Sequence, residues 1–151
     1  MLKVTSNLRN LDLSSNKIGS LPQNIGAFKM LKNLNMSKNR LSDLPDDLGK
    51  LVKLESLNLS FNSILSIPAS FNQLKHLREI QLSNNNISKF PASLVQLKQL
   101  NMLDLSHNKL TAVPDVVGGL EATELVLNCN QIQHVSPAIS NCPRLKVSLS
   151  N

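Results

Sequence analysis

The sequence predicts an α/β repeat solenoid: a right-handed coil with a parallel concave β-sheet on one side and short helical or 3₁₀ segments on the convex side. Three observations predict it. An apolar pattern recurs every 23 residues, part of it alternates apolar and polar positions, and a second apolar spacing of three residues follows. Stacked units of this kind bury one continuous core. We expect about six repeats in a single domain that covers residues 1–151.

The first part of each repeat has the pattern of a strand with one buried face. Its second and third apolar positions lie two residues apart, as in Leu11 and Leu13 or Leu57 and Leu59. Side chains of a strand alternate between its two faces, so this spacing predicts an apolar inner face and a polar outer face. The repeats start near Leu8, Leu31, Leu54, Leu77, Leu100 and Ala122, and a partial last repeat starts near Leu145.

The second part of each repeat predicts a short turn of helix. An apolar residue followed by Pro, as in Leu44-Pro45, precedes two apolar positions three residues apart, as in Leu48 and Leu51. Pro suits the first turn of a helix, where its missing N–H is not needed. A spacing of three fits a helical or 3₁₀ segment with one buried side.

One Asn recurs in every repeat, among positions that are otherwise apolar. A buried amide without partners would cost about 1–3 kcal/mol. We therefore predict a structural ladder, in which each Asn bonds the backbone of the turns above and below, so that Asn62→Ala lowers stability. The ladder consists of Asn16, Asn39, Asn62, Asn85, Asn108 and Asn130.

The combined pattern Leu-x-x-Leu-x-Leu-Ser-x-Asn-x-Leu-x-x-Leu-Pro covers essentially the whole chain. It resembles the intracellular class of leucine-rich repeat proteins with 23-residue repeats, the group that includes Ras-pathway scaffolds. The resemblance implies an intracellular, cytoplasmic interaction module for signalling, without catalytic activity or cofactor of its own.

The outward positions of the strands are the expected binding surface. They vary from repeat to repeat, whereas the Ser position that follows them is nearly constant. A solenoid normally binds extended partners on its concave side. Phe61 adds an exposed aromatic, which is a common anchor for a partner, so we expect Phe61→Ala to spare stability and weaken binding. The predicted contact residues are Asn33, Asn35, Ser56, Asn58, Phe61, Glu79, Gln81, Met102 and Asp104.

Other classes of function find little support in the sequence. Asp12 and Asp104 lie four repeats apart, about 20 Å at the usual strand spacing, which is too far for a catalytic carboxylate pair. We expect no catalytic residues, no metal site and no cofactor. The alternative is RNA binding through the basic N-terminal half, but single-stranded RNA needs aromatic stacking platforms, and Phe28, Phe71 and Phe90 fall in core positions.

A few residues bear on the cellular compartment and on the two ends of the chain. Two cysteines, Cys129 and Cys142, without terminal disulfide clusters favour a reducing compartment. No apolar run is long enough to span a membrane, residues 1–6 lack a signal peptide, and Leu2 replaces a lipid-acceptor Gly. We expect the chain to be a truncation or an isoform that lacks a capping segment at each end. We expect the open apolar faces of the two ends to associate end to end.

Overall fold

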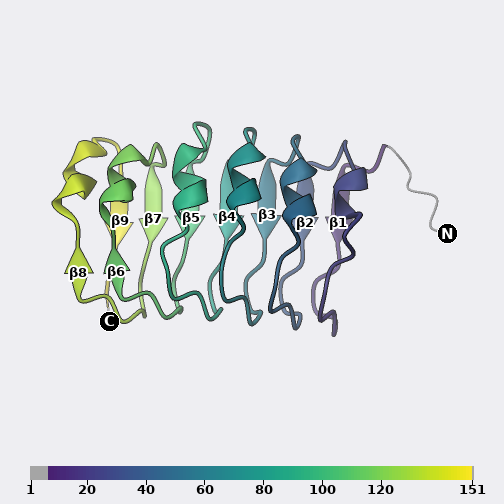
Figure 1. Cartoon of the computed structure of the whole chain (residues 1–151), viewed down its shortest axis with the longest axis horizontal. Helices are drawn as coiled ribbons and strands as arrows, with labels where there is room; N and C mark the ends of the chain where they lie inside the picture. The colour runs from purple at the N-terminus through teal and green to yellow at the C-terminus, as the bar shows by residue number, and fades with distance from the viewer. Residues whose placement is uncertain (1–6, 151) are drawn as a thin grey trace.

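The computed structural model describes residues 7–150 as a row of stacked coils, each with one strand on one side and one short turn on the other (Figure 1). A seven-stranded sheet runs the length of the row in the order β1-β2-β3-β4-β5-β7-β9, and every neighbouring pair is parallel. Its strands are β1 (Asn10–Asp12), β2 (Asn33–Asn35), β3 (Ser56–Asn58), β4 (Glu79–Gln81), β5 (Met102–Asp104), β7 (Glu124–Val126) and β9 (Lys146–Ser148). The predicted solenoid with a parallel sheet is confirmed.

Equivalent residues of successive repeats lie side by side in the sheet. Leu34 of β2 is in register with Leu57 of β3, and Leu57 with Ile80 of β4. These central residues are at most 2% exposed, whereas the residues on either side of them face solvent. The alternation in the sequence therefore sets which face of the sheet is buried.

Short 3₁₀ turns cover the opposite side of the core, as the spacing of three predicted (Figure 1). The structure corrects the place of proline. Four prolines stand one residue before their turns rather than inside the first turn: Pro45, Pro68, Pro91 and Pro114. The carbonyl group of each accepts the first i→i+3 hydrogen bond of its turn, as the Pro45 carbonyl does from Leu48 N–H at 3.1 Å. The turns are η1 (Ile25–Ala27), η2 (Asp46–Lys50), η3 (Ala69–Gln73), η4 (Ala92–Gln96), η5 (Asp115–Gly119) and η6 (Pro137–Asn141).

A second, two-stranded sheet was not foreseen. β6 (Ala112–Val113) pairs in parallel with β8 (His134–Val135) just before turns η5 and η6. The two residues of each strand are too few for a visible alternation in the sequence. The pairing depends on how the last repeats stack.

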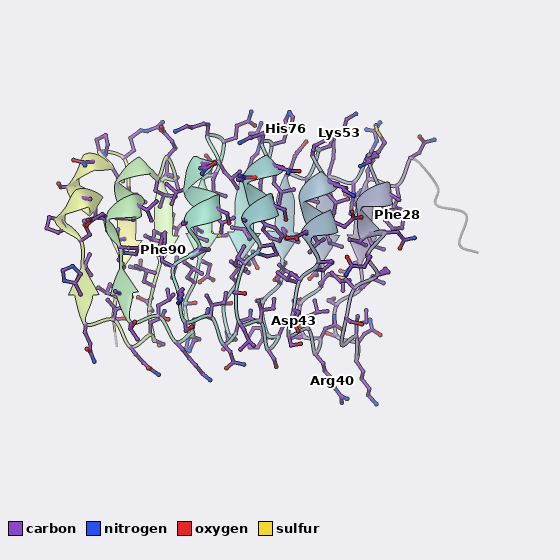
Figure 2. All side chains as sticks on the ribbon, in the orientation of Figure 1. Phe28, Arg40, Asp43, Lys53, His76 and Phe90 are labelled. Carbon is purple, nitrogen blue, oxygen red and sulfur yellow. The ribbon has the colours of Figure 1, made fainter. Side chains whose placement is uncertain are left out.

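The interior is one continuous apolar cluster that extends from Leu21 to Cys142. Phe71 is buried in it. Phe90 is also buried and Phe28 is half-buried at its edge (Figure 2), as the repeat positions of all three predicted. Cys142 is a buried free thiol that lies 3.2 Å from the Val117 carbonyl oxygen, while Cys129 is exposed. The leucine positions therefore build a core without a disulfide among the described residues.

The expectations about a signal peptide and a lipid-acceptor residue concern residues 1–6, which lie outside the described part of the chain. Within residues 7–150, no helix has both the length and the apolar character needed to cross a membrane.

Candidate functional site

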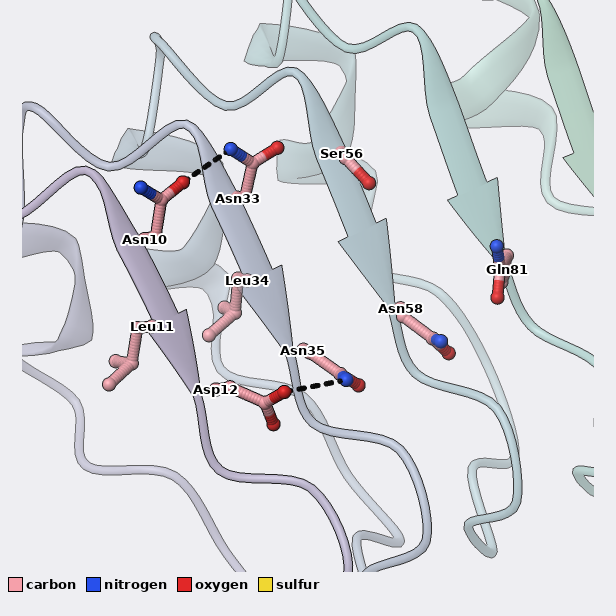
Figure 3. A pocket seen from close by; sticks show the side chains of 9 residues that line it. All are labelled: Asn10, Leu11, Asp12, Asn33, Leu34, Asn35, Ser56, Asn58 and Gln81. Carbon is pink, nitrogen blue, oxygen red and sulfur yellow. Dashed lines mark hydrogen bonds between the residues drawn. The ribbon is translucent and has the colours of Figure 1, made fainter.

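The solvent face of the seven-stranded sheet, termed the concave face below, is built from the first and third residue of each strand. Near β1–β4 it contains a hollow of about 320 Å³. Five sequence-predicted residues line this hollow: Asn33, Asn35, Ser56, Asn58 and Gln81 (Figure 3). The sheet brings them together because each of these strands presents its polar residues in the same register.

Hydrogen bonds along this row orient the side chains of the hollow. Asn33 Nδ2 donates to Asn10 Oδ1, and Asn35 Nδ2 donates to Asp12 Oδ2 at 3.2 Å (Figure 3). Asn58 Oδ1 accepts from both the N–H and the hydroxyl of Ser60, at 3.0 and 2.6 Å. The hollow therefore offers amide groups in fixed orientations.

Asn10 and Asp12 are not among the predicted contact residues, although they occupy the same two outward positions in the first repeat and line the hollow. Their place in the contact surface could have been inferred by aligning the repeats alone. Hydrogen bonds from Ser14 lower the pKa of the Asp12 carboxyl below its ordinary value, with a smaller contribution from Asn35. Asp12 thus places a carboxylate at the N-terminal end of the hollow.

The remaining predicted residues lie outside the hollow. Glu79 is exposed on β4, and Met102 and Asp104 are both partly exposed on β5. Asp104 Oδ1 accepts from Ser106 N–H and Oγ at 2.9 and 2.7 Å, the same local arrangement that holds Asn58. The concave face therefore has an amide-rich half over β1–β3 and a more acidic half from β4 onward.

The charge of the concave face is opposite in sign to that of the whole protein. The described strands of the large sheet carry four acids and a single cation, whereas the chain has a formal net charge of +6. The acids are Asp12, Glu79, Asp104 and Glu124, and the cation is Lys146. A face of this kind favours partner segments with polar or basic side chains.

Phe61 follows β3 and has 50% of its surface exposed. Its backbone is left-handed, with φ of 56°, and Lys38 Nζ lies 6.0 Å from the centre of its ring. The equivalent residue is left-handed in every described repeat: Ser15, Lys38, Phe61, Asn84, His107 and Cys129. This conformation costs an ordinary L-residue about 1–2 kcal/mol, whereas Asn adopts it more readily. This strain is not apparent in the sequence, because Gly does not occur at the position.

Replacing Phe61 by Asn is therefore expected to raise the free energy of unfolding by about 0.5–1 kcal/mol, measured by urea denaturation. Phe61→Ala is the matched control, because it removes the ring but keeps a residue unsuited to positive φ, and it should leave stability nearly unchanged. Equal stability of the Asn and Ala variants would show that the backbone at this position stores no relievable strain.

The recurrent Asn side chains lie behind this row of left-handed residues. Asn85 Nδ2 donates to the carbonyl oxygens of Leu59 and Leu82 at 3.0 and 3.1 Å, and its Oδ1 accepts from Ile64 N–H at 2.9 Å. Asn39, Asn62, Asn108 and Asn130 make the equivalent bonds, whereas Asn16 in the first repeat bonds only its own turn.

The expectation that each Asn bonds the turns above and below needs a correction. From Asn39 onward, each Asn side chain bonds its own repeat and the preceding repeat, but not the following repeat. The tie to the following repeat comes from the Asn of that repeat, as when Asn85 Nδ2 donates to the Leu59 carbonyl of the repeat that contains Asn62. One Asn therefore ties each pair of neighbouring repeats.

In the part of the chain that the structure describes, no arrangement of side chains indicates a catalytic site. Among residues 7–150, no group of three or more His, Cys, Asp or Glu side chains could hold a metal ion. Asp12 and Asp104 stand on β1 and β5, with three strands between them.

Comparisons with known proteins agree with this architecture. A family model described as leucine rich repeat matches residues 6–64 and 53–110. A leucine-rich repeat protein of Leptospira interrogans is 30% identical, with a TM-score of 0.83 over 95% of this chain and 37% of that one. The structure of PEPR1–AtPEP1 is 29% identical, with a TM-score of 0.81 over 95% of this chain and 21% of that one.

An internalin from Listeria monocytogenes shares the fold, with 24% identity and a TM-score of 0.77 over 95% of this chain and 43% of that one. A search of curated proteins gave no significant match. The chain spans less than half the length of each of these three structures.

The fold and the concave face define a repeat solenoid of the kind that presents a binding surface on a rigid scaffold. The chain belongs to the leucine-rich repeat family. Domains of this family generally mediate protein–protein interactions and are typically not enzymes.

Proposed function

We propose that this chain is a non-catalytic recognition module that binds a partner protein on its concave face, as a scaffold or regulator in signalling inside the cell, and that residues 1–151 form one domain. The observation that carries the proposal is the row of pre-oriented amide side chains in the hollow across β1–β4. Groups held in place lose little conformational entropy when a partner binds.

The proposed contact surface comprises the predicted residues together with Asn10 and Asp12. Amide groups can both donate and accept hydrogen bonds, so they suit an exposed polar segment of a protein. Phe61, at the edge of the face, supplies apolar area next to these polar groups. The more acidic half, with Glu79 and Asp104, would then contact basic or polar side chains of the same partner.

Intracellular location is part of the proposal, supported by the resemblance to the 23-residue class and by two cysteines that are both free thiols. End-to-end association also stays a prediction. It is supported by the exposed side chains of Val147 and Leu149, which are 39% and 45% exposed in and just after the last strand, β9.

A pull-down from cell lysate tests the concave face. The variant Phe61→Ala/Gln81→Ala/Asp104→Ala is expected to lose about tenfold or more of the specific partner, because it removes the anchor and two polar contacts. Quantitative mass spectrometry of the captured proteins measures the loss.

The matched control is Val116→Ala/Gln96→Ala/Asp46→Ala, which changes one apolar, one amide and one acidic residue on the exposed side of turns η5, η4 and η2. Proteins retained by this control and lost from the concave variant would support the proposal. Retention by both variants, or loss from both, would contradict it.

A further inference from the structure

A row of charged residues stands at the edge where the strands begin. Arg9, Lys32, Glu55 and Arg78 each directly precede one strand, from β1 to β4. Backbone hydrogen bonds join them in series: Lys32 N–H to the Arg9 carbonyl and Glu55 N–H to the Lys32 carbonyl, both at 2.7 Å, and Arg78 N–H to the Glu55 carbonyl at 2.8 Å. Three cations and one acid therefore occupy consecutive layers about 4.8 Å apart.

Lys53 and His76 lie at the same edge of the molecule (Figure 2). Together with Lys32 and Glu55 they line a shallow depression of about 280 Å³. The His76 ring is fixed by a contact of 2.8 Å between its Nδ1 and the Val52 carbonyl oxygen, and Lys53 Nζ lies 3.2 Å from Met30 Sδ. We use the term basic rim for Lys32, Lys53, His76 and Arg78 around Glu55.

Positive charge exceeds negative charge at the basic rim. Glu55 Oε1 accepts from Lys32 Nζ at 2.6 Å. This bond lowers the pKa of the Glu55 carboxyl, and the charges of Lys32, Arg78 and His76 lower it further. Lys53 and Arg78 make no ion pair with an acid within residues 7–150. The Glu55 carboxylate therefore faces several cations. Two of them, Lys53 and Arg78, are available to bind a carboxylate from a partner.

We propose that the basic rim binds an acidic segment of a protein, whose Asp or Glu carboxylates contact Lys53 and Arg78 and compete with Glu55 for Lys32. Glu55 then acts as an internal competitor that weakens the binding of weakly acidic segments. The proposal does not depend on the concave-face proposal, because it uses other side chains and a ligand of opposite charge.

A protein segment fits this edge better than single-stranded nucleic acid. Nucleic acid binding of that type combines a basic groove with aromatic stacking platforms. The basic rim contains no Phe, and Phe61 stands at the opposite end of β3. Carboxylates on a flexible segment need only the cations, which the rim supplies.

The test is fluorescence anisotropy with a fluorescein-labelled hexaglutamate peptide, with hexaglutamine as the uncharged control. Lys53→Ala/Arg78→Ala is expected to weaken hexaglutamate binding by about fivefold, and Glu55→Gln to strengthen it by about twofold, because exposed charge pairs of this kind are worth about 0.2–1 kcal/mol each. Added salt should weaken the binding, since exposed charges are screened.

Matched variants at the opposite edge separate a site from a general charge effect. Arg40 and Asp43 lie at that edge (Figure 2), and Lys17 occupies the repeat position of Arg40 one repeat earlier. Lys17→Ala/Arg40→Ala removes the same charge as the rim double variant, and Asp43→Asn changes charge as Glu55→Gln does. All these positions are at least partly exposed, so thermal melting should show folded variants.

Three results would overturn the proposal. The opposite-edge variants could alter hexaglutamate binding as much as the rim variants do, which would show a response to total charge only. The rim variants could have no effect. A uridine oligonucleotide could bind the rim more tightly than hexaglutamate, which would assign the rim to nucleic acid. A response confined to the rim variants, with hexaglutamate preferred, would support it whether or not the concave face binds a partner.

Discussion

Replacing Asn85 by Ala is expected to lower the free energy of unfolding by about 3 kcal/mol, because the change leaves the buried Ile64 N–H without its partner and removes two further hydrogen bonds. The Asn85 side chain is 7% exposed and bonds the carbonyl oxygens of Leu59 and Leu82 as well as the N–H of Ile64. Alanine can replace none of these bonds. The carbonyl oxygens of Leu59 and Leu82 keep a second donor each, Asn62 and Asn108, whereas the Ile64 N–H loses its partner.

Urea denaturation followed by circular dichroism measures this loss. Asn16→Ala is the internal control, because Asn16 is exposed and its bonds reach only Leu13 and Ser14 of its own turn. The control should lose less than about 1 kcal/mol. Similar losses for both variants would mean that the Asn side chain acts within its own turn and does not tie neighbouring repeats together.

Replacing Gly49 by Ala is expected to cost about 2–3 kcal/mol through overpacking between turns η2 and η3. A Cβ atom at Gly49 would lie 2.8 Å from Ser70 Cβ and still closer to the Ser70 backbone oxygen. Backbone atoms cannot rotate away as a side chain can, so the two turns would have to separate. The following layers of the convex side would then shift with them.

Thermal melting of Gly49→Ala and Gly19→Ala makes the comparison. Gly19 is the control because a Cβ there would meet nothing within 4 Å. Neither glycine has a positive φ, so conformational strain does not separate the two variants. A melting temperature for Gly49→Ala equal to that of Gly19→Ala would show that the turns can adjust at little cost.

The site could be predicted only in part. Alternation along each strand identified the outward residues, so Asn33, Asn35, Ser56, Asn58 and Gln81 were correctly placed on one face. Their hydrogen bonds to Asn10 and Asp12 could not be predicted, because a bond between repeats depends on side-chain rotamers and on the distance between strands. The ion pair between Lys32 and Glu55 also joins two repeats, because its residues are 23 positions apart, so it could not be predicted either.

The sequence by itself determined the repeat length, the parallel sheet, the buried leucine positions and the membership of the Asn ladder. These follow from periodicity, because a residue type that recurs at a fixed step must occupy the same environment in each layer. Only the tertiary structure decided the left-handed residues before each Asn, the direction of the ladder bonds, the pairing of β6 with β8 and the close approach at Gly49. Each of these depends on how far apart, and in what orientation, neighbouring layers stack, and that information is not contained in the period.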